Sequence, residues 1–164
     1  MNLFRTAALL AALSMTLPAR GMAQEESPTG ASEEAEPRYR NKLSGFIGVT
    51  LEGEANSFTL GVDYERRLGG QFGVGVLADR AFGEGRAFII AAGLFWHPLS
   101  RVRLDIAPGI EMSGADDETF FVVRIGADYD VELTERWSLG PNVNLDFVDG
   151  RTVWVLGAEV GYSF

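Results

Sequence analysis

Few side chains of this 164-residue chain could carry out catalysis. Histidine can serve as a general base and serine as a nucleophile, and the one histidine, His97, precedes Pro98 and lies close to Ser100. Asp128 and Asp130 form another candidate pair, but alternate residues of an extended segment line one face, as in a charged wall. The absence of cysteine excludes a cysteine nucleophile, a disulfide scaffold and a thiolate zinc site. We therefore predict no catalytic residue, no metal site, no cofactor and no enzymatic activity.

Ion pairing between arginine and carboxylates is the other chemistry that the sequence offers. Arg124 falls opposite Asp146, and Arg103 opposite Asp128, when the segments that carry them are paired across short turns. The planar guanidinium group can donate two parallel hydrogen bonds to a carboxylate, which suits a confined space. These pairs need a fold that holds neighbouring extended segments in register and encloses one of their faces.

The elements that would position these pairs are eight extended segments in which apolar and polar residues alternate. A period of two is typical of β-strands because successive side chains point to opposite sides. Every link between segments is too short for a crossover helix, which favours antiparallel neighbours in chain order. We predict an all-β fold, an eight-stranded antiparallel up-and-down β-barrel, with a β-sandwich as the alternative. The segments are residues 43–51, 57–67, 71–79, 86–99, 101–112, 121–132, 137–147 and 152–164.

The N-terminal part of the chain differs in composition from these segments. Residues 1–23 have the three parts of a secretory signal peptide, namely Arg5 near the start, an apolar run and a small-residue end at Ala23. Residues 24–42 are acidic and have little apolar surface, so we predict a disordered acidic leader before a barrel of residues 43–164. The net charge of -9 argues against nucleic acid as a partner.

The face of the strands that meets water decides between a soluble and a membrane-spanning barrel. A soluble lipocalin-like binder in the periplasm would enclose an apolar cavity. Here glycine concentrates on the polar face, where it fits the crowded interior of a narrow barrel. Aromatic residues lie at both ends of the apolar face, as membrane interfaces select. We therefore predict a transmembrane β-barrel whose aromatic girdle includes Tyr64, Trp96, Trp137 and Trp154.

The last segment, residues 152–164, carries outward apolar residues and ends with Tyr162 and Phe164. It resembles the C-terminal assembly signal of bacterial outer-membrane barrels. The chain after Lys42 resembles the small eight-stranded family that includes the OmpA barrel domain and OmpX-like proteins. The resemblance implies that the barrel assembly machinery recognises Tyr162 and Phe164, and that both termini face the periplasm of a Gram-negative-type bacterium. The loops expected at the cell surface are as short as the periplasmic turns, which argues against an adhesin.

The predicted interior carries more acidic than basic residues. Ten acidic residues and four arginines are expected to face inward, and the excess of carboxylates favours a wet, cation-favouring lumen that side chains nearly fill. They are Asp63, Glu65, Asp79, Asp105, Glu111, Asp128, Asp130, Glu132, Asp146 and Glu159, with Arg67, Arg101, Arg103 and Arg124. The arginine pairs would either plug the lumen or act as a gate across it.

We expect a monomeric structural or surface protein in contact with outer-membrane lipid. The alternative enzymatic reading is a lipid-modifying enzyme similar to lipid A deacylases. Those enzymes need histidine and serine at the lipid-facing outer rim, whereas His97 falls at a predicted periplasmic turn.

Overall fold

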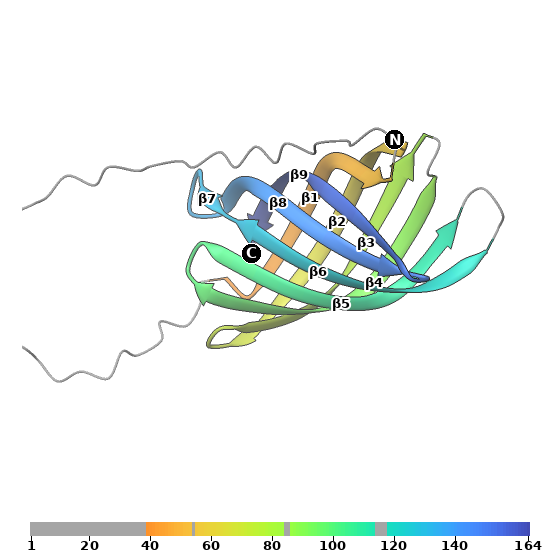
Figure 1. Ribbon diagram of the computed structural model, residues 1–164. Helices are drawn as coiled ribbons and strands as arrows, with labels where there is room; N and C mark the ends of the chain where they lie inside the picture. Colours follow the sequence, from red (N-terminus) through yellow and green to blue (C-terminus); the bar gives the residue numbers. More distant parts are fainter. Residues whose placement is uncertain (1–38, 54, 84–85, 114–117) are drawn as a thin grey trace, which may run out of the picture. The chain divides into compact units, whose positions relative to one another are not determined.

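A computed structural model of the protein describes residues 39–53, 55–83, 86–113 and 118–164. The predicted signal peptide and residues 24–38 of the predicted leader lie outside the described residues. The strands are β1 (Asn41–Glu52), β2 (Ala55–Gly69), β3 (Phe72–Phe82), β4 (Ala87–Leu99), β5 (Val102–Ser113), β6 (Thr119–Tyr129), β7 (Val131–Glu132), β8 (Trp137–Val148) and β9 (Arg151–Ser163) (Figure 1). Within the described residues, no helix is long and apolar enough to cross a membrane.

Consecutive strands pair in antiparallel fashion around a closed barrel. β1 pairs with β2 on one side and with β9 on the other, so the first and last strands close the sheet. β6 and β7 both pair with β8 and are separated only by Asp130, so together they occupy one of eight positions around the barrel. The predicted eight-stranded antiparallel up-and-down barrel is confirmed, and the β-sandwich alternative is wrong.

The strands are staggered as well as paired. We call the end of the barrel that holds Asn41 and Ser163 the terminal end, and the end that holds Glu52 and Arg151 the distal end. Stepping from each residue to its partner, from Asn41 across all the strands, returns to β1 at Leu51, ten residues further along. Such a stagger requires the strands to tilt against the barrel axis. The tilt brings side chains of strands that are not neighbours to one level inside the barrel.

Alternation along the strands separates a polar inside from an apolar outside. The inward side chains of Asp146 and Glu65 are 0% and 1% exposed, whereas the outward Val62 and Ile47 are 57% and 54% exposed. Charged groups inside and large apolar groups outside are the reverse of a soluble barrel. The predicted orientation of the two faces is therefore confirmed, and the lipocalin-like alternative with an apolar cavity is wrong.

Toward the distal end, the interior holds an apolar cluster that was not predicted from the sequence. Its members are Leu77, Ile89, Ala91, Ala107, Val122 and Val148, with Phe120 packed against them. The cluster explains why β4 is apolar on both faces, since Ile89 and Ala91 point into it while Ile90 and Leu94 are exposed on the outside, as predicted. The interior is therefore polar toward the terminal end and partly apolar toward the distal end.

Two inward phenylalanines lie against glycines of the barrel wall. Phe46 is an apolar residue on the otherwise polar inward face of β1. Its ring occupies the space that a Cβ of Gly48 or Gly157 would need. Phe95 covers Gly93 in the same way and is 1% exposed. An aromatic ring over a strand glycine fills the space left by the missing side chain. These glycines are therefore part of the interior packing.

We predict that Gly157→Ala lowers the free energy of unfolding by about 1–3 kcal/mol. The added methyl group would collide with the Phe46 ring and the carbonyl oxygen of Ile47. The measurement is urea-induced unfolding from lipid vesicles, followed by tryptophan fluorescence. Gly45→Ala is the matched control, because a Cβ at Gly45 meets nothing within 4 Å. Equal stability of the two variants would contradict the contact between the ring and the wall.

Candidate functional site

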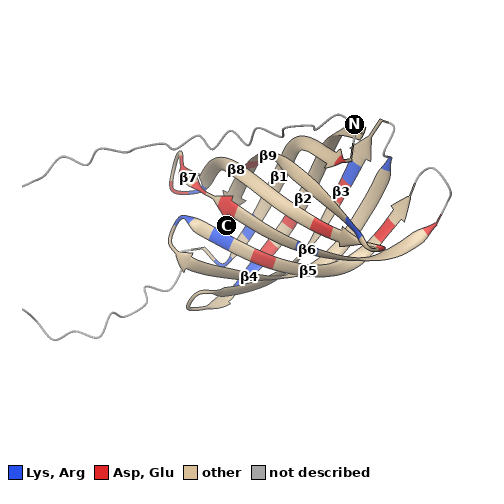
Figure 2. Ribbon diagram, viewed as in Figure 1, with Lys and Arg blue, Asp and Glu red and all other residues tan. Residues whose placement is uncertain are grey.

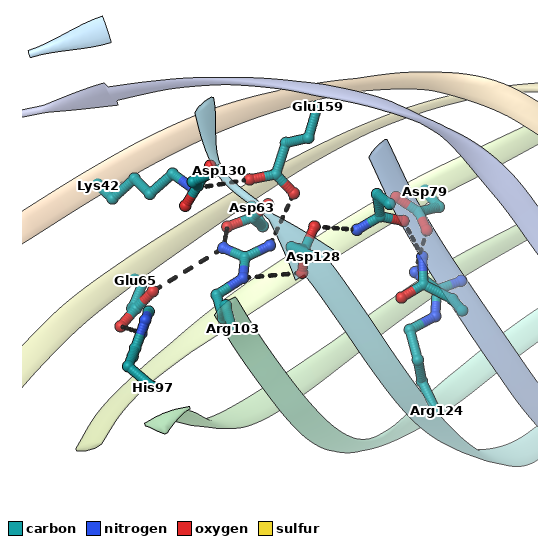
Figure 3. A network of polar contacts seen from close by, with 12 residues as sticks. Lys42, Asp63, Glu65, Asp79, His97, Arg103, Arg124, Asp128, Asp130 and Glu159 are labelled. Atoms are coloured by element: carbon teal, nitrogen blue, oxygen red, sulfur yellow. Dashed lines mark hydrogen bonds and ion pairs between the residues drawn. The ribbon is translucent and has the colours of Figure 1, made fainter. Parts of the chain in front are cut away.

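Two clusters of charged side chains inside the barrel are each built around one arginine. Figure 2 shows acidic and basic positions distributed along the strands, and Figure 3 shows how the inward ones meet. The first, the Arg103 cluster, comprises Arg103 with Asp63, Asp128 and Glu159. The second, the Arg124 cluster, comprises Arg124 with Asp79 and Asp146. Each arginine comes from one strand, β5 or β6, and its carboxylates come from other strands.

In the Arg103 cluster, one guanidinium group donates hydrogen bonds to three carboxylates, and its Nη1 also lies 3.8 Å from Glu65 Oε2 (Figure 3). Its Nε donates to Asp128 Oδ2 at 3.0 Å, as the register of β5 and β6 predicts. Its Nη1 donates to Asp63 Oδ1 at 3.1 Å, and its Nη2 donates to Glu159 Oε2 at 2.7 Å. Those two carboxylates come from β2 and β9, which do not pair with β5. The Phe95 ring lies 5.1 Å from the guanidinium carbon and adds a cation–π contact.

In the Arg124 cluster, the predicted opposition of Arg124 and Asp146 takes the form of a bidentate pair. The Nε and Nη2 atoms of Arg124 donate to the two carboxylate oxygens of Asp146 at 2.7 Å and 2.8 Å. The remaining Nη1 donates to Asp79 of β3, on a strand that does not pair with β6. The arginine and both carboxylates are buried. Parallel charge-assisted hydrogen bonds of this kind fix the orientation of both partners.

Lys42 belongs to the interior network, although the sequence analysis placed it in the disordered leader. β1 begins at Asn41, two residues before the expected boundary at Leu43, and Lys42 is buried. Its Nζ lies 2.8 Å from Asp130 Oδ2 and 3.1 Å from Glu159 Oε1. Glu159 thus joins Lys42 to the Arg103 cluster (Figure 3). The sequence allowed this prediction, because Lys42 lies two residues before the inward Ser44 and therefore points to the same side of the strand.

His97 lies inside the barrel, so the prediction that it occupies a periplasmic turn is wrong. β4 continues through Pro98 to Leu99, with a register shift against β5 that accommodates the missing N–H of proline. The buried His97 Nε2 is hydrogen-bonded to Glu65 Oε1 at 2.7 Å, and Arg67 Nε lies 3.1 Å from the same oxygen. Ser100 is exposed in the following turn.

Of the remaining residues expected to face inward, Arg101 and Glu132 do not, whereas Asp105 and Glu111 are buried inside the barrel as predicted. Arg101 and Glu132 are exposed at the terminal end, because Arg101 lies in the turn before β5 and Glu132 in the short β7 after the break at Asp130. Asp105 is buried, and its Oδ2 has no hydrogen-bond partner among the described residues. Near the distal end, Glu111 Oε1 lies 3.5 Å from Arg151 Nη2. The interior therefore holds more carboxylates than cations for two reasons. Asp105 has no ion-pair partner in the described part of the chain, and several carboxylates bind the same arginine.

The open space inside the barrel is uneven. A cavity of about 620 Å³ opens at the terminal end, where Lys42, Arg67, His97 and Asp130 contribute to its lining. Further in, a space of about 20 Å³ lies between the two arginine clusters and one of about 30 Å³ lies beside Arg124 toward the distal end. Such spaces hold about one or two water molecules each. The described residues contain no cluster of three or more potential metal ligands.

The predicted girdle residues lie on the outer surface or at its edge. Trp96, Trp137 and Trp154 are exposed, the first two toward the terminal end and Trp154 toward the distal end. Tyr64 is half-buried, and its hydroxyl donates a hydrogen bond to Asn41 Oδ1 at 2.8 Å. Large aromatic side chains thus flank the outward aliphatic band at both ends.

The C-terminal residues lie at the junction where β9 meets β1. The amide of Phe164 donates to the carbonyl oxygen of Asn41 at 2.9 Å, and the amide of Asn41 donates back at 3.1 Å. Tyr162 stacks with Phe164 and packs against Trp137 at a ring-centre distance of 4.9 Å, while Arg136 Nη1 donates to its hydroxyl at 3.0 Å. Tyr162 and Phe164 therefore belong to the contacts that close the barrel.

Comparison with known proteins identifies the fold. No family model matches the sequence, and no curated protein does. The crystal structure of Neisserial surface protein A matches with a TM-score of 0.55 and 12% identity, covering 77% of this chain and 97% of that one. The N-terminal β-barrel domain of OprF from Pseudomonas aeruginosa matches with a TM-score of 0.55 and 13% identity, covering 77% and 100%. The fold is that of small outer-membrane β-barrels.

A third match extends this similarity of fold. The outer membrane protein OprG from Pseudomonas aeruginosa has a TM-score of 0.53 and 10% identity, covering 80% of this chain and 99% of that one. Identities at this level show a shared architecture. The more specific resemblance to the OmpA barrel domain and OmpX-like proteins stays a prediction.

We predict that Arg124→Ala lowers the free energy of unfolding by about 3–5 kcal/mol, because Asp79 and Asp146 would be left buried without their cation. The control is Arg101→Ala. That arginine is exposed in the turn before β5, so its removal should cost about 0–0.5 kcal/mol. Urea titration in vesicles measures both. Similar small losses in the two variants would mean that water solvates the Arg124 cluster.

Proposed function

We propose that this chain is a small, non-enzymatic β-barrel of the outer membrane of a Gram-negative-type bacterium, with a structural or surface role and a lumen plugged by its own side chains. The observation that carries the proposal is the band of exposed aliphatic side chains around the barrel, flanked by tryptophans at both ends. Such a band is stable against acyl chains and prone to aggregation in water. The similar fold of Neisserial surface protein A and OprG supports the outer membrane as its location.

Assembly and orientation follow from the closing junction of the barrel. Tyr162 and Phe164 lie where β9 meets β1, so they stay accessible until the barrel closes. This position supports their recognition by the barrel assembly machinery before closure. We propose in addition that both termini face the periplasm. A closed barrel has no free strand edge, which supports a monomer surrounded by outer-membrane lipid.

The environment of His97 supports a non-enzymatic role. A lipid-modifying enzyme would present histidine and serine together at its lipid-facing rim. Here His97 points into the barrel and is engaged by Glu65, while Ser100 is exposed in a turn. A base that is already hydrogen-bonded inside the lumen lacks access to lipid ester groups.

The acidic interior supports a second candidate role, a narrow cation-favouring pore. Asp105 is buried without a paired cation in the described chain, next to the space between the two arginine clusters. Opening such a pore would require the arginines to leave their carboxylates, because the space between the clusters is only about 20 Å³ and the space beside Arg124 toward the distal end only about 30 Å³.

We predict that the full chain, expressed in a Gram-negative host, is recovered in the outer-membrane fraction and is extracted by detergent but not by alkaline carbonate. The folded protein should migrate faster on a gel than the boiled protein, because a closed barrel resists unfolding by dodecyl sulfate. Recovery of a folded protein in buffer without detergent would contradict the proposal.

We predict that the wild-type barrel gives no measurable conductance in planar bilayers, since its lumen is plugged. Small, cation-selective currents would favour the pore instead of the plug. Anion-selective currents would contradict both, because the carboxylates outnumber the cations inside the barrel.

A further inference from the structure

Two arginines interrupt the apolar outer surface near the distal end, one on β3 and one directly before β4. Arg80 lies on β3 between the outward Ala78 and Phe82, and it is exposed. Its partners on the neighbouring strands are Leu60 and Phe88. All four neighbours are apolar, so Arg80 is a cation within the face that contacts lipid.

Arg86 stands beside this position. It directly precedes Ala87, which pairs with Ala81, so the register of β3 and β4 places Arg86 next to Phe82. Arg86 is exposed as well. Arginine and phenylalanine therefore alternate across the two strands, with Arg80 next to Phe88 and Phe82 next to Arg86. We call these four residues the Arg80–Arg86 patch.

The arginines of the patch have no carboxylate partner among the described residues. The nearest interaction of Arg80 is with the Phe82 ring, whose centre lies 5.4 Å from the guanidinium carbon. A contact with a ring face leaves the N–H groups at the guanidinium edge available as donors. Arg151 provides the contrast at the same end, because it is paired with Glu52 and Glu111.

An arginine on the lipid-facing surface is costly in the hydrocarbon and tolerated near the interface, where its flexible stem lets the charge reach the headgroups. Headgroup phosphates are the anions found at that depth. Guanidinium binds phosphate with two parallel hydrogen bonds, and two guanidinium groups side by side can neutralise a doubly charged phosphate. The flanking phenylalanines offer apolar surface to the acyl chains of the same molecule. Free phosphate has no acyl chain that could contact that surface.

We propose that the Arg80–Arg86 patch is a binding site for the phosphate headgroup of an anionic lipid in the leaflet that the distal end reaches. The two arginines hold the phosphate group, and Phe82 and Phe88 pack against the lipid's apolar part. This inference rests on the membrane-spanning role proposed above and adds a lipid class to it.

The test uses the full chain, refolded in phosphate-free maltoside micelles and titrated with short-chain phosphatidic acid. The readout is the shift of the arginine Nε–H signals in ¹⁵N NMR spectra, from which a Kd is fitted. The double variant Arg80→Gln with Arg86→Gln should weaken binding about tenfold or more, since it removes charge-assisted hydrogen bonds. Arg151→Gln is the matched control, which removes one arginine at the same end and should change Kd less than twofold.

Two further titrations test the ligand class. Inorganic phosphate, without acyl chains, and decanoate, with a carboxylate head, should both bind more weakly than phosphatidic acid. Equal binding of either probe, or an unchanged Kd in the double variant, would overturn the inference. Heat-modified gel migration of every variant reports folding separately. A barrel that folds normally without binding the lipid refutes the site and leaves the membrane role intact, whereas a chain that needs no detergent refutes the membrane role itself.

Discussion

The narrow bore of an eight-stranded barrel is the constraint on which the rest of this structure depends. Every inward side chain must fit a tube that has space for isolated water molecules beyond its mouth. At inward glycines, the space that a side chain would occupy is filled by the longer side chain of a neighbouring residue. The Asp79 carboxylate occupies the space beside Gly61, and the Glu65 carboxylate occupies the space beside Gly73. These two buried carboxylates thus fit because a residue on the neighbouring strand has no side chain.

Charge in so narrow a space must be neutralised locally, and arginine does so for several carboxylates at once. Burying an ion pair gives little net stability compared with apolar packing, but leaving one partner alone is strongly unfavourable. This asymmetry bears on register. Arg103 pairs with Asp128 across β5 and β6, and Arg124 pairs with Asp146 across β6 and β8. A slip of one residue in β6 would turn Arg124 and Asp128 toward lipid, so the ion pairs select one register of this strand.

The sequence was sufficient where structure follows from neighbouring residues. Alternation identified the strands and their outward faces, and short turns set the order that brought Arg124 opposite Asp146. The sequence was insufficient to predict contacts that depend on how the sheet closes into a barrel. The contacts of Arg103 with Asp63 and Glu159 cross the lumen between strands that do not pair, and they depend on the stagger of the whole barrel. His97 was misplaced for a local reason, because proline signals a turn unless a register shift lets the strand continue past it.

The interior becomes more apolar along the barrel axis from the terminal end to the distal end. This change in polarity determines which charged groups are in contact with the solvent. At the terminal end, the cavity reaches Lys42, His97 and Asp130 directly. Deeper in, the Arg124 cluster is bounded by the apolar side chains that gather toward the distal end, among them Val122 and Val148. Ions and water entering from the terminal end therefore meet the pair of Lys42 and Asp130 first. Arg103 and Arg124 do not line that cavity and are 2% and 3% exposed, so the barrel shields both arginine clusters from the solvent on that side.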